Sequence, residues 1–289
     1  MTTATGEPGM TDISEPATDV ARMYERTTAL VEVIWGPNLH FGYWTGPDDD
    51  TGKDLAQERL TDMMVERVPL GPGQRLLDLG CGVGHPALRF ARRTGAGVVG
   101  VTIAPGQVRA ATAAARAAGL HDRVAFELAD AAALPFPDDG FDGAWALESM
   151  PHMSDRGAVL REAARVLRPG STLALTDVAR CGPLSERQQR DLRERMLITA
   201  PPRSELAELL DAAGFDVLEV LDITRSTLRT TELTRQALEA GAVELSGRYG
   251  AETVEHMARV LDVYDDAVRT GMEYLLVTAR LRPAAGGAS

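Results

Sequence analysis

Residues 76–84 read LLDLGCGVG, an apolar run that leads directly into glycines at alternate positions. The apolar run predicts a buried strand, and the residues after the glycines predict a helix. Because glycine has no Cβ, these positions permit a tight turn and the close approach of a ligand to the backbone. The loop therefore predicts a ligand at the N-terminus of the following helix, where amide N–H groups point outward.

The spacing of this loop argues against a dinucleotide. The dinucleotide fingerprint is G-x-G-x-x-G, but the loop reads G-x-G-x-G, and His85 stands where the last glycine of the fingerprint belongs. The carboxylate of Asp78 before the loop disfavours a pyrophosphate and suits a cationic amino-acid group. We therefore expect S-adenosylmethionine, which carries an ammonium and a sulfonium, to contact Asp78, Gly80, Gly82 and Gly84. A purely structural glycine turn is the alternative.

From residue 71 to about residue 177, short apolar strands are predicted to alternate with helices. This alternation predicts an α/β fold with a doubly wound, mostly parallel sheet, that is, a Rossmann-like fold. Two late strands, one at the end of the chain, predict an antiparallel pair at one edge. The expected strands cover residues 74–79, 97–103, 124–128, 141–147, 172–177, 217–223 and 273–281, and the expected helices 20–35, 86–94, 105–118, 155–166, 184–196, 203–213 and most of 233–270.

The chain divides into four predicted parts. Residues 1–19 lack both a basic start and an apolar run, so we expect a disordered leader rather than a secretory signal, and a cytoplasmic protein behind it. Residues 20–70 combine an amphipathic helix with a loop rich in aromatic residues, which predicts a lid. Residues 71–180 form the expected cofactor-binding core. Residues 181–289 complete the sheet and contain an inserted helical cap at about 225–270.

The composition of the chain limits the kinds of molecule that it is expected to bind. The net charge is −12 and no basic stripe overrides it, so nucleic acid and anionic membrane surfaces are disfavoured. No apolar stretch approaches the roughly 20 residues that a membrane span requires. The two cysteines are too few for a thiolate zinc site, and no metal is expected. A small-molecule acceptor is therefore the expected partner, for a chain that is a monomer or a homodimer.

Several motifs in their order along the chain resemble class I S-adenosylmethionine-dependent methyltransferases. They are the glycine loop, Ala129-Asp130-Ala131, Phe141-Asp142 and the LRPG of residues 167–170. Residues 34–44, 146–150 and 152–157 resemble more narrowly the natural-product methyltransferases of actinomycetes, of the rebeccamycin sugar O-methyltransferase type. The resemblance covers residues 20–177 well and the cap poorly. It implies methyl transfer to a small molecule in secondary metabolism, such as antibiotic biosynthesis.

Other residues are expected around the cofactor. Asp130 ends the third strand and suits an adenine amino group, although an N-cap role is the alternative. Ala131 and Leu147 are expected to hold apolar parts of the ligand. In the resembled class the second strand usually ends in an acid that binds the ribose. Here Thr102 and Gln107 stand nearby and offer neutral hydrogen bonds instead.

His152 is the first candidate for a general base. It follows the fourth strand, at the end of the sheet where ligands bind in open α/β folds. The resembled enzyme type has two consecutive histidines here, but Pro151 replaces the first, so only His152 carries the role over. Asp177, which ends the fifth strand, is expected to orient His152 or to act as the base itself. Tyr24 is expected to fold over the cofactor from the N-terminal helix.

The acceptor atom stays open at this stage. Methylation of a hydroxyl oxygen requires a base, so His152 and the resemblance favour it. Methylation of nitrogen or carbon on a natural product or terpenoid is one alternative, because positioning does most of that work. A non-methylating cyclase on the same fold is another, because its glycine loop would look the same.

Overall fold

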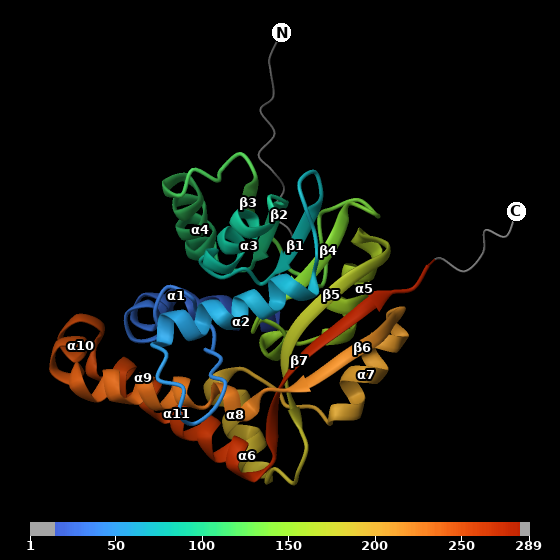
Figure 1. Cartoon of the computed structure of the whole chain (residues 1–289). Helices are drawn as coiled ribbons and strands as arrows, with labels where there is room; N and C mark the ends of the chain where they lie inside the picture. Colours follow the sequence, from blue (N-terminus) through green and yellow to red (C-terminus); the bar gives the residue numbers. More distant parts are fainter. Residues whose placement is uncertain (1–14, 284–289) are drawn as a thin grey trace, which may run out of the picture.

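The computed structural model describes residues 15–283 as a seven-stranded sheet surrounded by helices (Figure 1). The strand order is β3-β2-β1-β4-β5-β7-β6, and β7 runs antiparallel to both of its neighbours, while the other pairs are parallel. This confirms the predicted α/β class and the antiparallel edge. The strands are β1 (Arg75–Leu79), β2 (Gly97–Thr102), β3 (Val124–Leu128), β4 (Phe141–Ala146), β5 (Leu167–Arg180), β6 (Phe215–Asp222) and β7 (Met272–Leu281).

Both faces of the central strands are buried, as their continuous apolar sequences require, whereas the edge strand β6 is largely exposed. Successive residues of β1 point to opposite faces: Leu76 joins one core cluster and Leu77 the other. On the first face, Phe90 packs edge-to-face on Trp145, with ring centroids 5.0 Å apart. The helices around these two cores are α2 (Lys53–Arg67), α3 (His85–Thr94) and α4 (Pro105–Ala117) on the first face, and α5 (Arg156–Val166) and α7 (Arg203–Ala212) on the second.

The strand order places a switch point between β1 and β4. The chain moves outward from β1 to β3 and then returns to the other side of β1 as β4. Crevices form at such a point, outside the carboxyl ends of the strands, and ligands of open α/β sheets bind there. The glycine loop follows β1 at this edge, so the topology predicts a ligand-binding crevice next to the loop.

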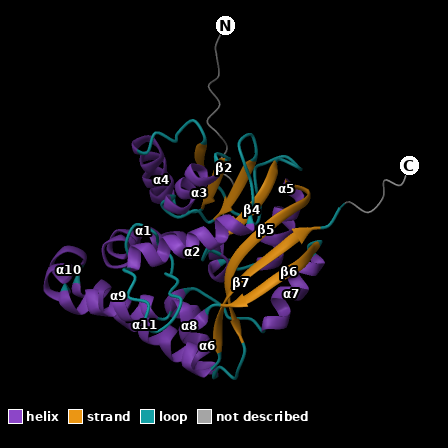
Figure 2. Cartoon of the chain, viewed as in Figure 1, coloured by secondary structure: helices purple, strands orange, loops and turns teal. Residues whose placement is uncertain are grey.

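A helical layer lies beside the sheet (Figure 2). It combines the N-terminal helix α1 (Glu15–Trp35) with helices from the last third of the chain. Leu30 and Ile34 of α1 share a core with Leu238, Leu245 and Leu261. The late helices are α8 (Thr224–Thr227), α9 (Arg229–Ala240), α10 (Ala242–Tyr249) and α11 (Ala251–Thr270). Within residues 15–283, no helix is both long enough and apolar enough to cross a bilayer.

Some element boundaries differ from the expectations. β5 begins at Leu167, directly after α5, and continues to Arg180 because its pairing with β7 extends that far. The helix expected over 184–196 divides into α6 (Glu186–Asp191), capped by Ser185, and a π-helical turn, η2 (Leu192–Met196). α1 already begins at Glu15, and the rest of the expected leader, residues 1–14, lies outside the described residues.

Candidate active site

The three glycines of the loop have different tasks, although all have positive φ angles. A Cβ on Gly80 would lie 2.3 Å from the Cβ of Ser149, and one on Gly84 would lie 2.5 Å from Phe126. These two glycines let the loop pack against its neighbours. At Gly82, with φ +52°, a Cβ would meet only Leu39, at 3.9 Å, within 4 Å. Gly82 therefore leaves space for a ligand close to the backbone.

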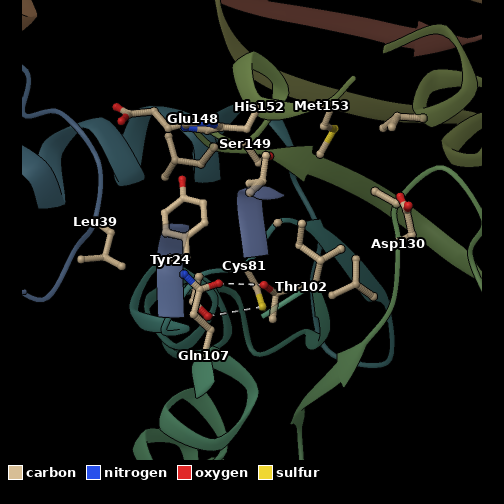
Figure 3. Close-up of a pocket in the computed structure, with 18 of the residues that line it drawn as sticks. Tyr24, Leu39, Cys81, Thr102, Gln107, Asp130, Glu148, Ser149, His152 and Met153 are labelled. Carbon is tan, nitrogen blue, oxygen red and sulfur yellow. Dashed lines mark hydrogen bonds between the residues drawn. The ribbon is translucent and has the colours of Figure 1, made fainter. Parts of the chain in front are cut away.

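A cavity opens directly above this loop, and we call it the cofactor cavity (Figure 3). It holds about 1030 Å³ of space not filled by atoms, including its mouth. The structure brings nine of the predicted residues to its wall and leaves Asp78, Gly84 and Asp177 off it. The nine are Tyr24, Gly80, Gly82, Thr102, Gln107, Asp130, Ala131, Leu147 and His152.

The wall of the cofactor cavity offers an amide, a hydroxyl and a carboxylate for hydrogen bonds. Thr102 Oγ1 donates to Gln107 Oε1 over 2.7 Å, and both side chains are buried. This bond leaves the Gln107 amide nitrogen as a donor without a partner among the described side chains. Asp130 Oδ1 accepts from the Ala132 amide over 2.9 Å at the end of β3. Hydroxyl and amine groups of a nucleoside suit this combination of amide, hydroxyl and carboxylate.

Asp78 lies one step below the cavity, within the sheet. It pairs in register with Gly100 of β2 and with Trp145 of β4, and only 2 % of it is exposed. Its Oδ2 has no hydrogen-bond partner among the described residues, and burial raises the pKa of the carboxyl to about 7. Direct contact between Asp78 and an ammonium group stays a prediction, because the structure does not bring this side chain to the wall.

Asp177 does not have the position of a base. Its carboxylate is completely buried and accepts from Arg156, with Nε–Oδ2 at 2.7 Å and Nη2–Oδ1 at 3.0 Å. Arg156 also donates to Oγ1 and the carbonyl oxygen of Thr199. Burial raises the pKa of Asp177, while Arg156 and the Val178 amide counteract the rise. The expectation for Asp177 is therefore corrected: it joins β5 to α5 and to the segment around Thr199.

The substitution Asp177→Asn tests this correction. We expect it to lower the free energy of unfolding by about 2 kcal/mol, because the buried Arg156 loses its charged partner. Thermal unfolding measures this loss, with Asp122→Asn as the control at a fully solvated carboxylate. S-adenosylhomocysteine, the demethylated form of the expected cofactor, should still bind with wild-type affinity to the folded variant. An unchanged melting temperature combined with lost turnover would contradict the structural role.

His152 lies where the sequence predicts it, beside the cofactor cavity. It ends the short 3₁₀ turn η1 (Met150–His152) after β4, and the ring of Tyr24 approaches it edge-on at 5.6 Å. Its Nδ1 is buried and has no hydrogen-bond partner within residues 15–283. Burial lowers the pKa of His152 to about 4. The imidazole is therefore neutral at physiological pH and has a lone pair available for a proton.

A second cavity adjoins the first, and we call it the apolar cavity. It lies among α1, α11 and the π-helical turn. Four residues line both cavities and form what we call the shared wall: Tyr24, Leu39, Glu148 and His152. The rest of its lining is largely apolar or aromatic, and includes Val31, Trp35, Phe41, Val178, Met196, Ile198, Met257, Val260, Leu261, Tyr264 and Tyr274.

The sequence analysis missed two residues of the shared wall, Leu39 and Glu148, and Glu148 is the polar one. Its Oε1 accepts from the Phe41 amide at 2.5 Å and from Tyr274 Oη at 2.6 Å. Its backbone has a φ of +56°, which is uncommon for a residue with a side chain. Burial raises the pKa of its carboxyl to about 8. The one available signal was its place directly after the apolar run of the fourth strand, at the ligand end of the sheet.

The loop rich in aromatic residues, residues 35–44, contributes less to the cofactor cavity than its composition indicates. Leu39 and His40 line the cavity, but both ring nitrogens of His40 have partners: Phe41 O at 2.8 Å and Thr61 Oγ1 at 3.0 Å. Phe41 stacks on Tyr264 of α11 instead, with ring centroids 5.0 Å apart. The loop thus ties the helical layer to the sheet, and its aromatic rings serve mainly as packing.

The cofactor cavity fits S-adenosylmethionine by its own chemistry. The space over Gly82 admits a ligand against the backbone, and Thr102, Gln107 and Asp130 offer hydrogen bonds for the nucleoside. Ala131 and Leu147 add apolar surface beside them. Among the described residues that line the cavity, none is a lysine such as a phosphate-binding loop requires.

Comparisons with known proteins agree with this reading. Residues 77–175 match a family model described as a methyltransferase domain. The (+)-O-methylkolavelool synthase of Herpetosiphon aurantiacus is 36 % identical over 94 % of this chain and 98 % of its own. The 27-O-demethylrifamycin SV methyltransferase of Amycolatopsis mediterranei is 48 % identical over 55 % of this chain and 58 % of its own. The solved structure of the [4+2]-cyclase SpnF has a TM-score of 0.82 and 34 % identity, covering 94 % of this chain and 98 % of that one.

The similarities to the kolavelool enzyme and to the cyclase each extend over 94 % of the chain, beyond the cofactor-binding motifs. The family, the enzyme class and the cofactor predicted from the sequence are thereby confirmed. The narrower resemblance to the rebeccamycin type stays a prediction. With S-adenosylmethionine as its cofactor, the chain belongs to the class I S-adenosylmethionine-dependent methyltransferases.

Proposed function

We propose that this enzyme methylates a hydroxyl oxygen of a natural product that binds in the apolar cavity. The shared wall carries this proposal. Tyr24, Leu39, Glu148 and His152 line both cavities, so a donor on one side and an acceptor on the other meet at these residues. The neutral His152 at that meeting point supplies what a hydroxyl nucleophile requires and an amine does not, namely a group that takes its proton.

The chemistry divides simply between cofactor and protein. S-adenosylmethionine supplies a methyl group that is activated by a positively charged sulfur. The protein aligns the acceptor oxygen with that methyl group and excludes water with the apolar side chains around the shared wall; such alignment is worth effective molarities on the order of 10⁵–10⁸ M. As the oxygen–carbon bond forms and the sulfur–carbon bond breaks, the hydroxyl proton passes to His152 Nδ1. A pKa of about 4 suffices, because an alkylated oxonium is far more acidic than an imidazolium.

The names of the relatives support oxygen as the acceptor. One is named for (+)-O-methylkolavelool and another for 27-O-demethylrifamycin SV. The similarity to a [4+2]-cyclase over almost the full length favours a second candidate, a cyclisation without methyl transfer. The two functions differ in a simple way, because a cyclase leaves the cofactor unconsumed.

A labelled cofactor distinguishes these candidates. The purified enzyme is incubated with S-adenosylmethionine bearing a trideuterated methyl group, and with kolavelool or 27-O-demethylrifamycin SV as the acceptor. We expect mass spectrometry to detect the label on at least one acceptor, and NMR to place it on oxygen. Label on nitrogen or carbon would contradict the proposal. So would an isomerised acceptor of unchanged mass with the cofactor intact.

A further inference from the structure

The apolar cavity contains two polar atoms that its lining does not satisfy. Tyr264 Oη is buried and makes no hydrogen bond of good geometry within the described part of the chain, although the Thr227 side chain interacts with it. Glu148 bonds through Oε1 only, so that its Oε2 has no donor among the described residues. Buried polar groups in native proteins are nearly always paired, because an unpaired one loses its water without compensation. Tyr264 Oη is an atom of this kind, and the half-buried Glu148 adds an oxygen without a protein donor on the same cavity. Together they indicate that a ligand supplies the partner.

The protein holds Glu148 firmly in this position. The Glu148 amide donates to Thr176 Oγ1 over 2.8 Å, which supports the unusual left-handed backbone. The Phe41 amide and Tyr274 Oη together fix Oε1, so the direction of the carboxyl group is determined and only Oε2 is left over. Strained backbone at a non-glycine residue is characteristic of ligand sites, where the surroundings pay for the strain.

Tyr264 belongs to the same group of side chains. Its ring stacks on Phe41, whose amide binds Glu148, and the charge of Glu148 raises the pKa of Tyr264 together with burial. The two groups therefore lie near enough to serve one ligand. Neither of the groups is used by the proton transfer to His152, which requires only the reacting hydroxyl.

We propose that Glu148 and Tyr264 bind a second oxygen group of the acceptor, a hydroxyl or a carbonyl, while the first hydroxyl faces His152. The acceptor is then a lipophilic molecule with at least two oxygen groups, rather than a free sugar or a hydrocarbon alcohol with one. This inference rests on the proposed function only in taking the apolar cavity as the acceptor site. Glu148 and Tyr264 decide which hydroxyl reaches the methyl group.

A set of matched probes tests the inference without methyl transfer. The complex with S-adenosylhomocysteine is titrated with decan-1-ol, decane-1,2-diol and decane-1,4-diol, and binding is followed by calorimetry and by tryptophan fluorescence, since Trp35 lines the apolar cavity. We expect at least one diol to bind the wild type about tenfold more tightly than decan-1-ol, as one additional buried hydrogen bond allows. That advantage should fall below about twofold in Glu148→Leu and Tyr264→Phe.

Two further variants separate binding from structure. Glu148→Gln keeps two hydrogen-bonding atoms at the end of the side chain, an oxygen and a nitrogen in place of two oxygens. It should therefore retain most of the diol preference. Tyr43→Phe removes a tyrosine hydroxyl outside both cavities and should retain all of it. Tyr264→Phe removes one atom and keeps the ring on Phe41, so it remains informative if Glu148→Leu fails to fold.

Several results would overturn the inference. They are equal affinities of diols and decan-1-ol for the wild type, no binding of any probe, or a full diol preference in folded Tyr264→Phe. Failure of the proposed function has a different signature. A preserved diol preference without any methyl ether product would leave the two-oxygen acceptor intact and reject only the methylation.

Discussion

The substitution Gly82→Val is expected to weaken the binding of S-adenosylhomocysteine at least 100-fold, about 2.7 kcal/mol. Within residues 15–283, only Leu39 lies within 4 Å of the position that a Cβ would take at Gly82, so the valine side chain would fill space that the ligand requires. The φ of +52° adds strain for a β-branched residue. Isothermal titration calorimetry with S-adenosylhomocysteine measures the change directly and requires no acceptor.

Gly119→Val is the matched control for backbone strain. Gly119 ends the helix before β3 with a φ of +66°, and a Cβ there would meet no atom within 4 Å. The two variants should therefore lose similar stability through the left-handed backbone, but Gly119→Val should bind the ligand as the wild type does. Wild-type affinity in Gly82→Val, or equal losses in both variants, would contradict a ligand lying against the loop.

The cofactor cavity could be predicted well because its residues are local in the sequence. Gly80 and Leu147 directly follow a strand, Thr102 ends one, and Asp130 comes two residues after β3. The carboxyl ends of parallel strands meet at the same edge of the sheet. A reader who identifies the strands therefore places the wall correctly without coordinates. The spacing of the glycines then limits the class of ligand that the loop can bind. This spacing can be read from the sequence because the glycines are close neighbours in it.

The expectation for Asp177 needed correction because its side chain depends on a distant partner. Asp177 looks available at the end of a strand, but its partner Arg156 is 21 residues away, and nothing local indicates that the two will pair. The contact of Asp78 with the cofactor stays a prediction, since this side chain two residues before Gly80 is buried and is not on the cavity wall. The sequence shows that both residues carry a carboxylate, but it does not show where their side chains point.

The apolar cavity could not be predicted for a similar reason. It lies between α1 and α11, whose sequences are separated by more than 200 residues, and no motif indicates that they come together. The free oxygen of Glu148 is equally hidden, because it depends on the Phe41 amide, 107 residues away. Sequence therefore indicates how the methyl donor is held better than it indicates what receives the methyl group.

His152→Ala is expected to lower kcat about 10²–10⁴-fold on the acceptor that gains the label, while the Kd for S-adenosylhomocysteine changes less than about twofold. The loss follows from removal of the group that takes the hydroxyl proton. The affinity is preserved because the glycine loop and the Thr102–Gln107 end of the cavity do not depend on the imidazole. Steady-state kinetics and calorimetry on the same preparations test both halves.

The role of His152 as a base also sets the pH dependence. Burial lowers its pKa to about 4, so the imidazole is neutral above that value and becomes charged, and unable to accept a proton, only as the pH falls through it. The part of the plot of kcat against pH that reports His152 should therefore be flat from about pH 5.5 to 8. With an unperturbed histidine, kcat would fall as the pH drops through its ordinary pKa of about 6.5. A midpoint near 6.5 would show that His152 is far more solvated during catalysis.

The comparison with His152→Gln distinguishes a base from a mere spacer. Glutamine keeps volume and hydrogen-bonding atoms beside Tyr24 but takes up no proton, so it should be as slow as alanine if proton transfer is the role. Added imidazole should then restore part of the turnover of His152→Ala, because the truncated side chain leaves room for it. Wild-type turnover in His152→Gln would instead assign His152 to positioning and make Glu148, the acidic residue of the shared wall, the remaining proton acceptor there.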